Sequence, residues 1–272
     1  MATNSWQHLP QDPQFNKQRF KRKLLRYGFL CFIAIASIGV GRYFLKTVDG
    51  SIQRLEQVKF SSDGMLTEAW FLNTIPLPWK EQLMKVDLAQ LQQEILQYSQ
   101  VEAVEIIREF PSSIHVHIHE KKACAKTLLS QKGKRKLLLI TSQGEFFAPI
   151  GYTRSILMVL PTISGLHKGL LANQKIVQFE AIAQFIHLLQ MEVPDVYDRM
   201  SSLSLRHFDP SLEEKWWILD LHLKGGLIAT MPIMKASEAF RNWKLIFKNL
   251  PQQQQTSLKK IDLSLSHPTL TF

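Results

Sequence analysis

Residues 101–120 read VEAVEIIREFPSSIHVHIHE, and this segment decides the fold of the chain around it. Its second half alternates strictly between apolar and histidine side chains, so one face of a strand is apolar and the other carries imidazoles. Pro111 separates this half from an apolar run at 101–110, and proline followed by serines is typical of a turn. We therefore predict two strands joined by a proline turn. The apolar residues of the alternating strand are Ile114, Val116 and Ile118, and the histidines are His115, His117 and His119.

The residues before this pair of strands predict two helices and one further strand. Asp87 is a good helix cap, because Gln90 follows at capping-box spacing and apolar residues then recur at helical spacing. A shorter apolar segment at 65–73 predicts another helix, and residues 51–60 predict a strand. The order β-α-α-β-β between residues 50 and 122 predicts a small two-layer domain, with two helices on one face of a sheet.

Residues 123–272 predict a second, sheet-rich domain, which assigns the whole chain to the α+β class. Amphipathic helices are expected at 177–190 and 237–250, and a polar linker at 252–255. The expected strands cover residues 136–141, 145–147, 155–160, 200–208, 216–223, 227–230 and 258–265.

The N-terminal part contains a basic run at 17–26 that leads directly into an apolar segment ending at Leu45. A helix from Leu24 to Leu45 would span about 33 Å, enough for a hydrocarbon core of about 30 Å. The basic side is expected in the cytoplasm and everything after the segment outside it. We predict a basic cytoplasmic tail at 1–26 and a transmembrane anchor at 27–45.

A cleaved signal peptide is the alternative for this segment, because Ala34-Ile35-Ala36 has the small-x-small pattern that signal peptidase reads. The anchor is favoured because the apolar run continues beyond these residues.

The formal charge of +10 does not by itself indicate nucleic-acid binding. Residues 1–26 hold six basic side chains and one acidic one, which the positive-inside rule explains. The remaining positive charge is expected to be spread evenly over the residues after 26, with no block of like charge. The two cysteines, Cys31 and Cys124, are expected on different sides of the membrane boundary, so the outer part should fold without an internal disulfide.

The histidines are the strongest candidates for chemistry, because an H-x-H pair on a strand can chelate zinc. A third imidazole in line is badly placed for a tetrahedron, so a solvent-facing strand is favoured and no metal or cofactor is expected. No catalytic set is recognisable elsewhere. A secreted or anchored metal-dependent hydrolase using His115, His117 and His119 is kept as the alternative function.

The motifs from residue 86 onward resemble the POTRA domain and β-domain of the cell-division proteins FtsQ and DivIB. Those proteins typically read V-x-R-x-x-P and then L-x-I-x-V-x-E-R-x-P. The later hairpin at 137–147, the L-P-x-I-x-G pattern at 160–165 and I-D-L at 261–263 follow in the order of that family. The residues that carry the first part of the resemblance are Ile106, Arg108, Pro111, Ile114, Val116, Ile118 and Glu120.

The resemblance implies a single-pass division protein without enzymatic activity, lying in the inner membrane at the division septum with its domains at 50–122 (POTRA) and 123–272 (β-domain) outside the cytoplasm. Its implied partners are FtsB- and FtsL-like proteins, with an FtsK-like protein and the septal peptidoglycan synthase as further candidates, and no nucleic acid. In that family the last strand of the β-domain pairs with a segment of FtsB. The positions that match the family's partner-binding residues are Asp262, Leu263, Ser264, Leu265, Thr269, Leu270, Thr271, Phe272, Ile106 and Arg108.

Overall fold

The computed structural model describes residues 54–131, 133–173 and 175–272. The predicted tail and anchor lie outside these residues. Within the described part, no helix combines the length and apolar character needed to cross a membrane. Residues Leu55–Phe272 form one compact unit by their mutual contacts.

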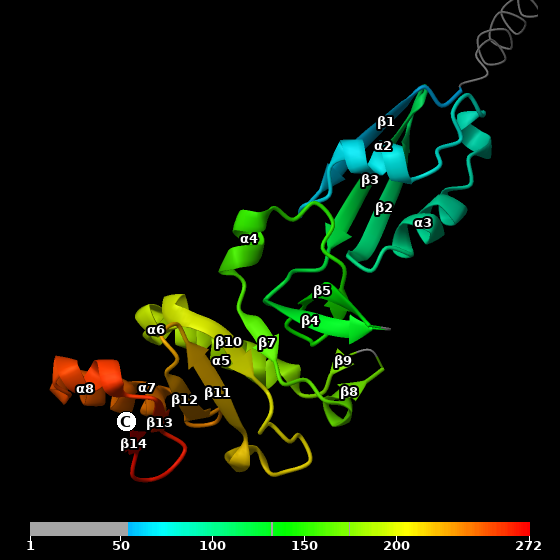
Figure 1. The fold of residues 1–272 in the computed structure, drawn as a ribbon. Coiled ribbons are helices and arrows are strands. Elements are labelled where there is room, and N and C mark those ends of the chain that lie inside the picture. Colours follow the sequence, from blue (N-terminus) through cyan, green and yellow to red (C-terminus); the bar gives the residue numbers. More distant parts are fainter. Residues whose placement is uncertain (1–53, 132, 174) are drawn as a thin grey trace, which may run out of the picture. The chain divides into compact units, whose positions relative to one another are not determined.

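The N-terminal sheet has three strands in the order β1-β3-β2 (Figure 1). Strand β1 (Gln57–Ser62) lies parallel to β3 (Ser113–Glu120), which pairs antiparallel with β2 (Val101–Glu109). Helices α2 (Glu68–Thr74) and α3 (Leu88–Leu96) come between β1 and β2 in the chain. The predicted order β-α-α-β-β is therefore confirmed.

The apolar face of the alternating strand forms the centre of the N-terminal core. Ile114 and Ile118 are fully buried together with Phe71 of α2 and Ile95 of α3. Asp87 caps α3 as predicted. Its Oδ1 accepts hydrogen bonds of 3.0 Å from the backbone amides of Ala89 and Gln90.

The C-terminal region contains one sheet of nine strands in the order β14-β13-β12-β11-β10-β7-β4-β5-β6. Two very short strands, β8 (Leu171–Ala172) and β9 (Lys175–Ile176), form a separate hairpin. The nine strands are β4 (Ala125–Gln131), β5 (Lys134–Ile140), β6 (Phe146–Phe147), β7 (Thr162–Ser164), β10 (Met200–Ser204), β11 (Ile218–Leu223), β12 (Ile228–Pro232), β13 (Lys260–Asp262) and β14 (Thr269–Thr271).

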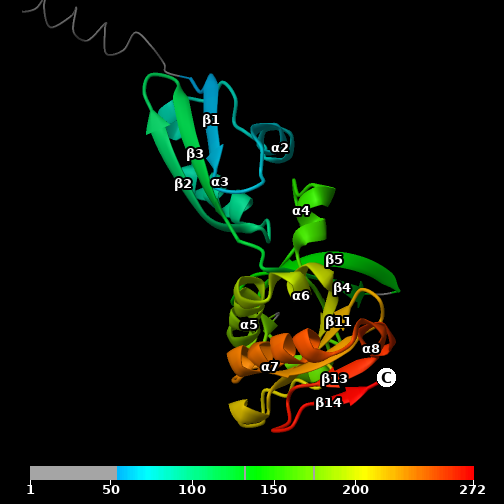
Figure 2. The same ribbon diagram turned by 90° about the vertical axis from the view of Figure 1, so that its left-hand side faces the viewer.

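Helices α5 (Phe179–Glu192) and α7 (Ala236–Asn249) pack side by side and bury their apolar faces in the second core (Figure 2). The ring centroids of Phe185 on α5 and Phe240 on α7 are 5.6 Å apart, and both side chains are buried. The helices predicted at 177–190 and 237–250 are thus confirmed. A short helix, α6 (Pro194–Arg199), follows α5.

Two local predictions were wrong. Residues 155–160 were predicted as a strand, but 155–159 belong to helix α4 (Arg154–Val159) and Leu160 is its extended C-cap. The strand position beside β4 is taken by β7, which starts after Pro161. The predicted linker at 252–255 belongs to helix α8 (Gln252–Ser257). Proline fixes the backbone angle that a helix start requires, so Pro251 precedes a new helix as well as ending the previous one.

The contact between α5 and α7 predicts a large effect of truncating Phe240. We expect Phe240→Ala to lower the free energy of unfolding by about 3–5 kcal/mol, because it leaves a cavity in the second core. Leu245→Ala on the same helix is the matched control. Its side chain is 52% exposed, so the loss should stay below about 1 kcal/mol. Equal losses in denaturant unfolding would contradict this packing.

Candidate interaction surfaces

A buried carboxylate lies where the N-terminal sheet meets the C-terminal region. Glu120, the last residue of β3, is only 3% exposed. Its carboxylate accepts hydrogen bonds from the Ser62 hydroxyl, from the backbone amide of Leu66 (2.7 Å) and from Nε2 of Gln100 (2.6 Å). These donors replace the water that a carboxylate loses on burial, which otherwise makes a buried charge very unfavourable.

Gln100 extends this network into the segment that follows β6. Its Nε2 also donates to the carbonyl of Ile150 (3.0 Å), and its Oε1 accepts from the amide of Ile150 (2.7 Å). Ser99 adds a third bond there, because its hydroxyl accepts from the amide of Ala148 at 3.1 Å. Buried Gln100 is therefore a direct link between the N-terminal domain and the segment that follows β6.

Two glycines allow this close approach. A Cβ added to Gly64 would lie 2.4 Å from the carboxyl carbon of Glu120. A Cβ added to Gly151 would lie 2.3 Å from the carbonyl oxygen of Met65, and Gly151 also has a positive φ of +76°. A side chain at either position would separate the hydrogen-bonded groups.

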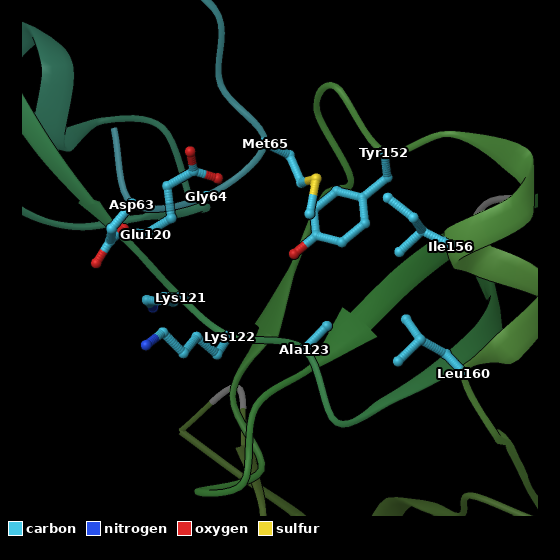
Figure 3. A pocket seen from close by; sticks show the side chains of 10 residues that line it. All are labelled: Asp63, Gly64, Met65, Glu120, Lys121, Lys122, Ala123, Tyr152, Ile156 and Leu160. Atoms are coloured by element: carbon cyan, nitrogen blue, oxygen red, sulfur yellow. The ribbon is translucent and has the colours of Figure 1, made fainter. Parts of the chain in front are cut away.

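A hollow of about 300 Å³ lies beside the buried carboxylate (Figure 3). Apolar side chains and the Tyr152 ring line one side of it, and charged side chains from the ends of β1 and β3 and the residues just after them line the other. Burial raises the pKa of Tyr152 above its ordinary value. The lining residues are Asp63, Gly64, Met65, Glu120, Lys121, Lys122, Ala123, Tyr152, Ile156 and Leu160.

The three histidines lie on the open face of the N-terminal sheet, as the alternation predicted. The Ser61 hydroxyl is 3.1 Å from Nε2 of His115 and 2.8 Å from Nδ1 of His117. Nδ1 of His119 lies 3.4 Å from the carboxylate of Asp63, and Nε2 lies 3.4 Å from that of Glu105. The hydrogen bond with Asp63, and then that with Glu105, raises the pKa of His119 above its usual value.

Among the described residues, no group of three His, Cys, Asp or Glu side chains is arranged to hold a metal ion. The imidazoles instead contact a hydroxyl and carboxylates of the neighbouring strands. This geometry gives the metal-dependent hydrolase no support.

Ile106 and Arg108, two of the predicted binding residues, lie on β2. Ile106 is half-buried and packs against the first core. The Arg108 guanidinium donates to the carbonyls of Leu83 (3.0 Å) and Val86 (2.6 Å), so it holds the 3₁₀ turn at Leu83–Lys85 against β2. Both side chains have structural contacts within the chain.

The predicted residues near the C-terminus divide between an inner strand and an edge strand. Asp262 belongs to β13, which lies between β12 and β14, and Leu263 is buried with its amide bonded to Thr230 at 2.8 Å. Ser264 donates to Asp262 through its amide and its hydroxyl. Strand β14 is the outer edge of the sheet, and the exposed or half-exposed residues on or beside it are Leu265, Thr269, Leu270, Thr271 and Phe272.

The sequence contains one charge pattern that contradicts the expected even spread. Residues 121–144 hold seven lysines and arginines and no acidic residue. The structure places most of them on or beside the β4–β5 hairpin, where Lys134, Arg135 and Lys136 are all exposed. The block is visible when charges are compared along the whole chain, and not only in the basic run at 17–26.

Residues 53–121 match the family model of the POTRA domain, FtsQ-type. This range includes all three strands and both helices of the N-terminal sheet, so these residues form a POTRA domain of the FtsQ type. The resemblance to FtsQ and DivIB is thereby confirmed for residues 53–121. Proteins with this domain work in cell-division complexes and are generally not enzymes, which indicates a scaffold role in cell division. No curated protein matches the chain.

Glu145 carries an ion pair that makes stability depend on pH. Its carboxylate lies 2.7 Å from Nζ of Lys121 and 2.5 Å from Nζ of Lys175, and hydrogen bonds from these lysines lower its pKa from 4.5 to about 2. Since the folded pKa is depressed, the stabilisation is complete above pH 4.5 and is lost as the pH falls toward 2.

We therefore expect Glu145→Gln to lower the free energy of unfolding by about 1 kcal/mol at pH 7 and to have little effect at pH 2. Glu213→Gln is the control, because Glu213 pairs with Lys215 at an exposed surface and should change little at either pH. Denaturant unfolding at both pH values measures the difference. A loss for Glu145→Gln that is the same at pH 7 and pH 2 would show that the ion pairs are not its cause.

Proposed function

We propose that the chain is a membrane-anchored, non-enzymatic scaffold of the division septum that binds other division proteins through the edge of its C-terminal sheet. The anchor is the segment 27–45 in the inner membrane, with the N-terminus in the cytoplasm and the POTRA domain and β-domain outside it. The proposed partners are FtsB- and FtsL-like proteins, and through them the septal peptidoglycan synthase. The FtsQ-type POTRA domain, followed in the chain by a sheet that ends in an open edge strand, carries this proposal.

Strand β14 supports pairing with a partner strand because one of its sides has no strand neighbour among the described residues. An edge strand offers unpaired N–H and C=O groups, to which an extended segment of another protein can add. The other side of β14 is held by β13 in register, with Leu270 opposite Ile261. The edge is thus already extended before a partner arrives, which lowers the entropy lost on binding.

The side chains beside this edge provide the apolar area that main-chain hydrogen bonds alone do not. Leu265 is 54% exposed and Phe272 is 48% exposed. Full burial of such a side chain contributes about 1.5–3 kcal/mol, whereas each added hydrogen bond contributes about 0.5–1.5 kcal/mol net. Burying the exposed halves of the two side chains should therefore contribute about as much as two or three hydrogen bonds.

The FtsQ and DivIB pattern places Arg-Tyr where this chain has Ser264-Leu265. A cation and a phenol are thus replaced by a short hydroxyl and an aliphatic side chain. We infer that the partner segment that faces Leu265 is more apolar than the segment that faces Arg-Tyr in FtsQ and DivIB.

Removing the two apolar side chains tests this surface without unfolding the sheet. We expect full-length protein with Leu265→Ser and Phe272→Ser to retain an FtsB-like partner at least tenfold more weakly in co-purification. Leu212→Ser with Trp216→Ser is the matched control, because these side chains are 50% and 62% exposed elsewhere in the same region. Deleting residues 258–272 is less suitable, because Leu258, Ile261 and Leu263 are buried in the core.

Two outcomes would count against the proposal. One is equal retention of the partner by both double variants. The other is unchanged hydrogen exchange of the β14 amides when the partner binds, since strand addition must protect the unpaired groups.

A further inference from the structure

The opposite end of the nine-stranded sheet has a second open edge. Strand β6 pairs only with Leu139 and Ile140 of β5. On that side, residues 134–138 of β5 have no strand neighbour within the described part of the chain. Their other side is paired with β4 along its full length, so the backbone is already extended.

This free edge is strongly basic. Lys134, Arg135 and Lys136 are consecutive and exposed, and none of them takes part in an ion pair among the described residues. Consecutive side chains on a strand point to opposite faces, so Lys134 and Lys136 share one face and Arg135 lies on the other. Half-buried Leu137 and 57%-exposed Leu128, which are directly paired, add an apolar patch to the face of Arg135.

We propose that residues 134–138 of β5 bind an extended acidic segment of a partner protein, which adds to this edge as a tenth strand. Main-chain groups supply the pairing, and acidic side chains opposite the three cations supply selectivity. Each opposite-charge pair across neighbouring strands tightens binding by roughly 1.4- to 5-fold. Three such pairs therefore tighten binding by roughly 3- to 100-fold.

The same cations keep a second copy of the chain away. Two β5 edges brought together would place like charges opposite each other, which is unfavourable, and lysine on an edge strand is a common protection against self-pairing. A surface that repels itself and attracts acidic strands gains specificity from both effects.

Two other anionic partners fit the hairpin less well. Single-stranded nucleic acid is usually bound by aromatic side chains that stack on bases, and residues 121–144 contain no aromatic residue. A membrane surface would use the charges and not the open main-chain groups of residues 134–138. An acidic strand uses both features.

Binding of a labelled peptide to the full-length protein tests the proposal. The probe is an eight-residue fluorescent peptide in which three consecutive glutamates are flanked by threonines, so that glutamates lie on both faces of the added strand. The same peptide with lysine in place of glutamate is its control. The variant Lys134→Gln, Arg135→Gln, Lys136→Gln keeps the main-chain edge and removes the charge. Arg241→Gln, Lys244→Gln, Lys248→Gln removes three exposed charges from α7 and serves as the matched protein control.

We expect the acidic peptide to bind, the β5 variant to bind it at least threefold more weakly, and the α7 variant to bind it unchanged. Hydrogen exchange of amides 134–138 should slow when the peptide binds. Leu265→Ser with Phe272→Ser should leave this binding unaffected, which separates it from the edge at β14.

Three results would overturn the proposal. The first is equal affinity of the β5 and α7 variants. The second is peptide binding without protection of amides 134–138. The third is binding of phosphatidylglycerol vesicles or duplex DNA as tight as that of the peptide, which would indicate a general attraction to anions.

Discussion

The buried carboxylate of Glu120 holds Gln100, and Gln100 joins the N-terminal domain to the segment that follows β6. Glu120 ends the alternating strand β3, and its donors come from the segment after β1, from the residue before β2 and from Ser62. A buried carboxylate without donors is highly unfavourable, so the network is stable only when all of these groups are in place. Gln100 carries the constraint onward to Ile150, and Gly64 and Gly151 leave the space for it.

The groups that maintain the fold are different from the strand edges that are free to bind a partner. Arg108 and Glu145 make bonds within the chain, and their removal is expected to affect stability first. In the nine-stranded sheet, the free main-chain groups lie at the two ends, at β14 and at β5. One end is flanked by apolar side chains and the other by cations, so we propose that the two edges bind different partner segments.

Local patterns predicted the parts of the fold that depend on periodicity. The alternation around His117 and the cap at Asp87 each specify one element through neighbouring residues only, and both are confirmed. The apolar stripe of the helix around Phe240 was equally clear. Where two elements compete for the same position, these patterns were insufficient. Residues 155–160 are apolar enough for a strand, but the sheet position beside β4 is filled by β7.

The interaction surfaces were harder to predict, because they depend on which strand lies outermost. Asp262 and Thr269 belong to adjacent strands, and only the sheet order shows that β14 is the edge. Nothing local distinguishes Gln100 from the other glutamines of its segment, since its role requires Ile150 to approach from fifty residues away. The basic block around Arg135 was visible in the sequence, but its importance follows from the short length of β6.

The distance between the two cores in solution tests the role of Glu120 most directly. Nitroxide labels at Glu102→Cys on β2 and Lys244→Cys on α7, in a chain with Cys31→Ser and Cys124→Ala, report this distance by pulsed electron paramagnetic resonance. We predict one narrow distance distribution for this chain and a broad one after Glu120→Ala. A broad distribution before that substitution, or an unchanged narrow one after it, would contradict the account.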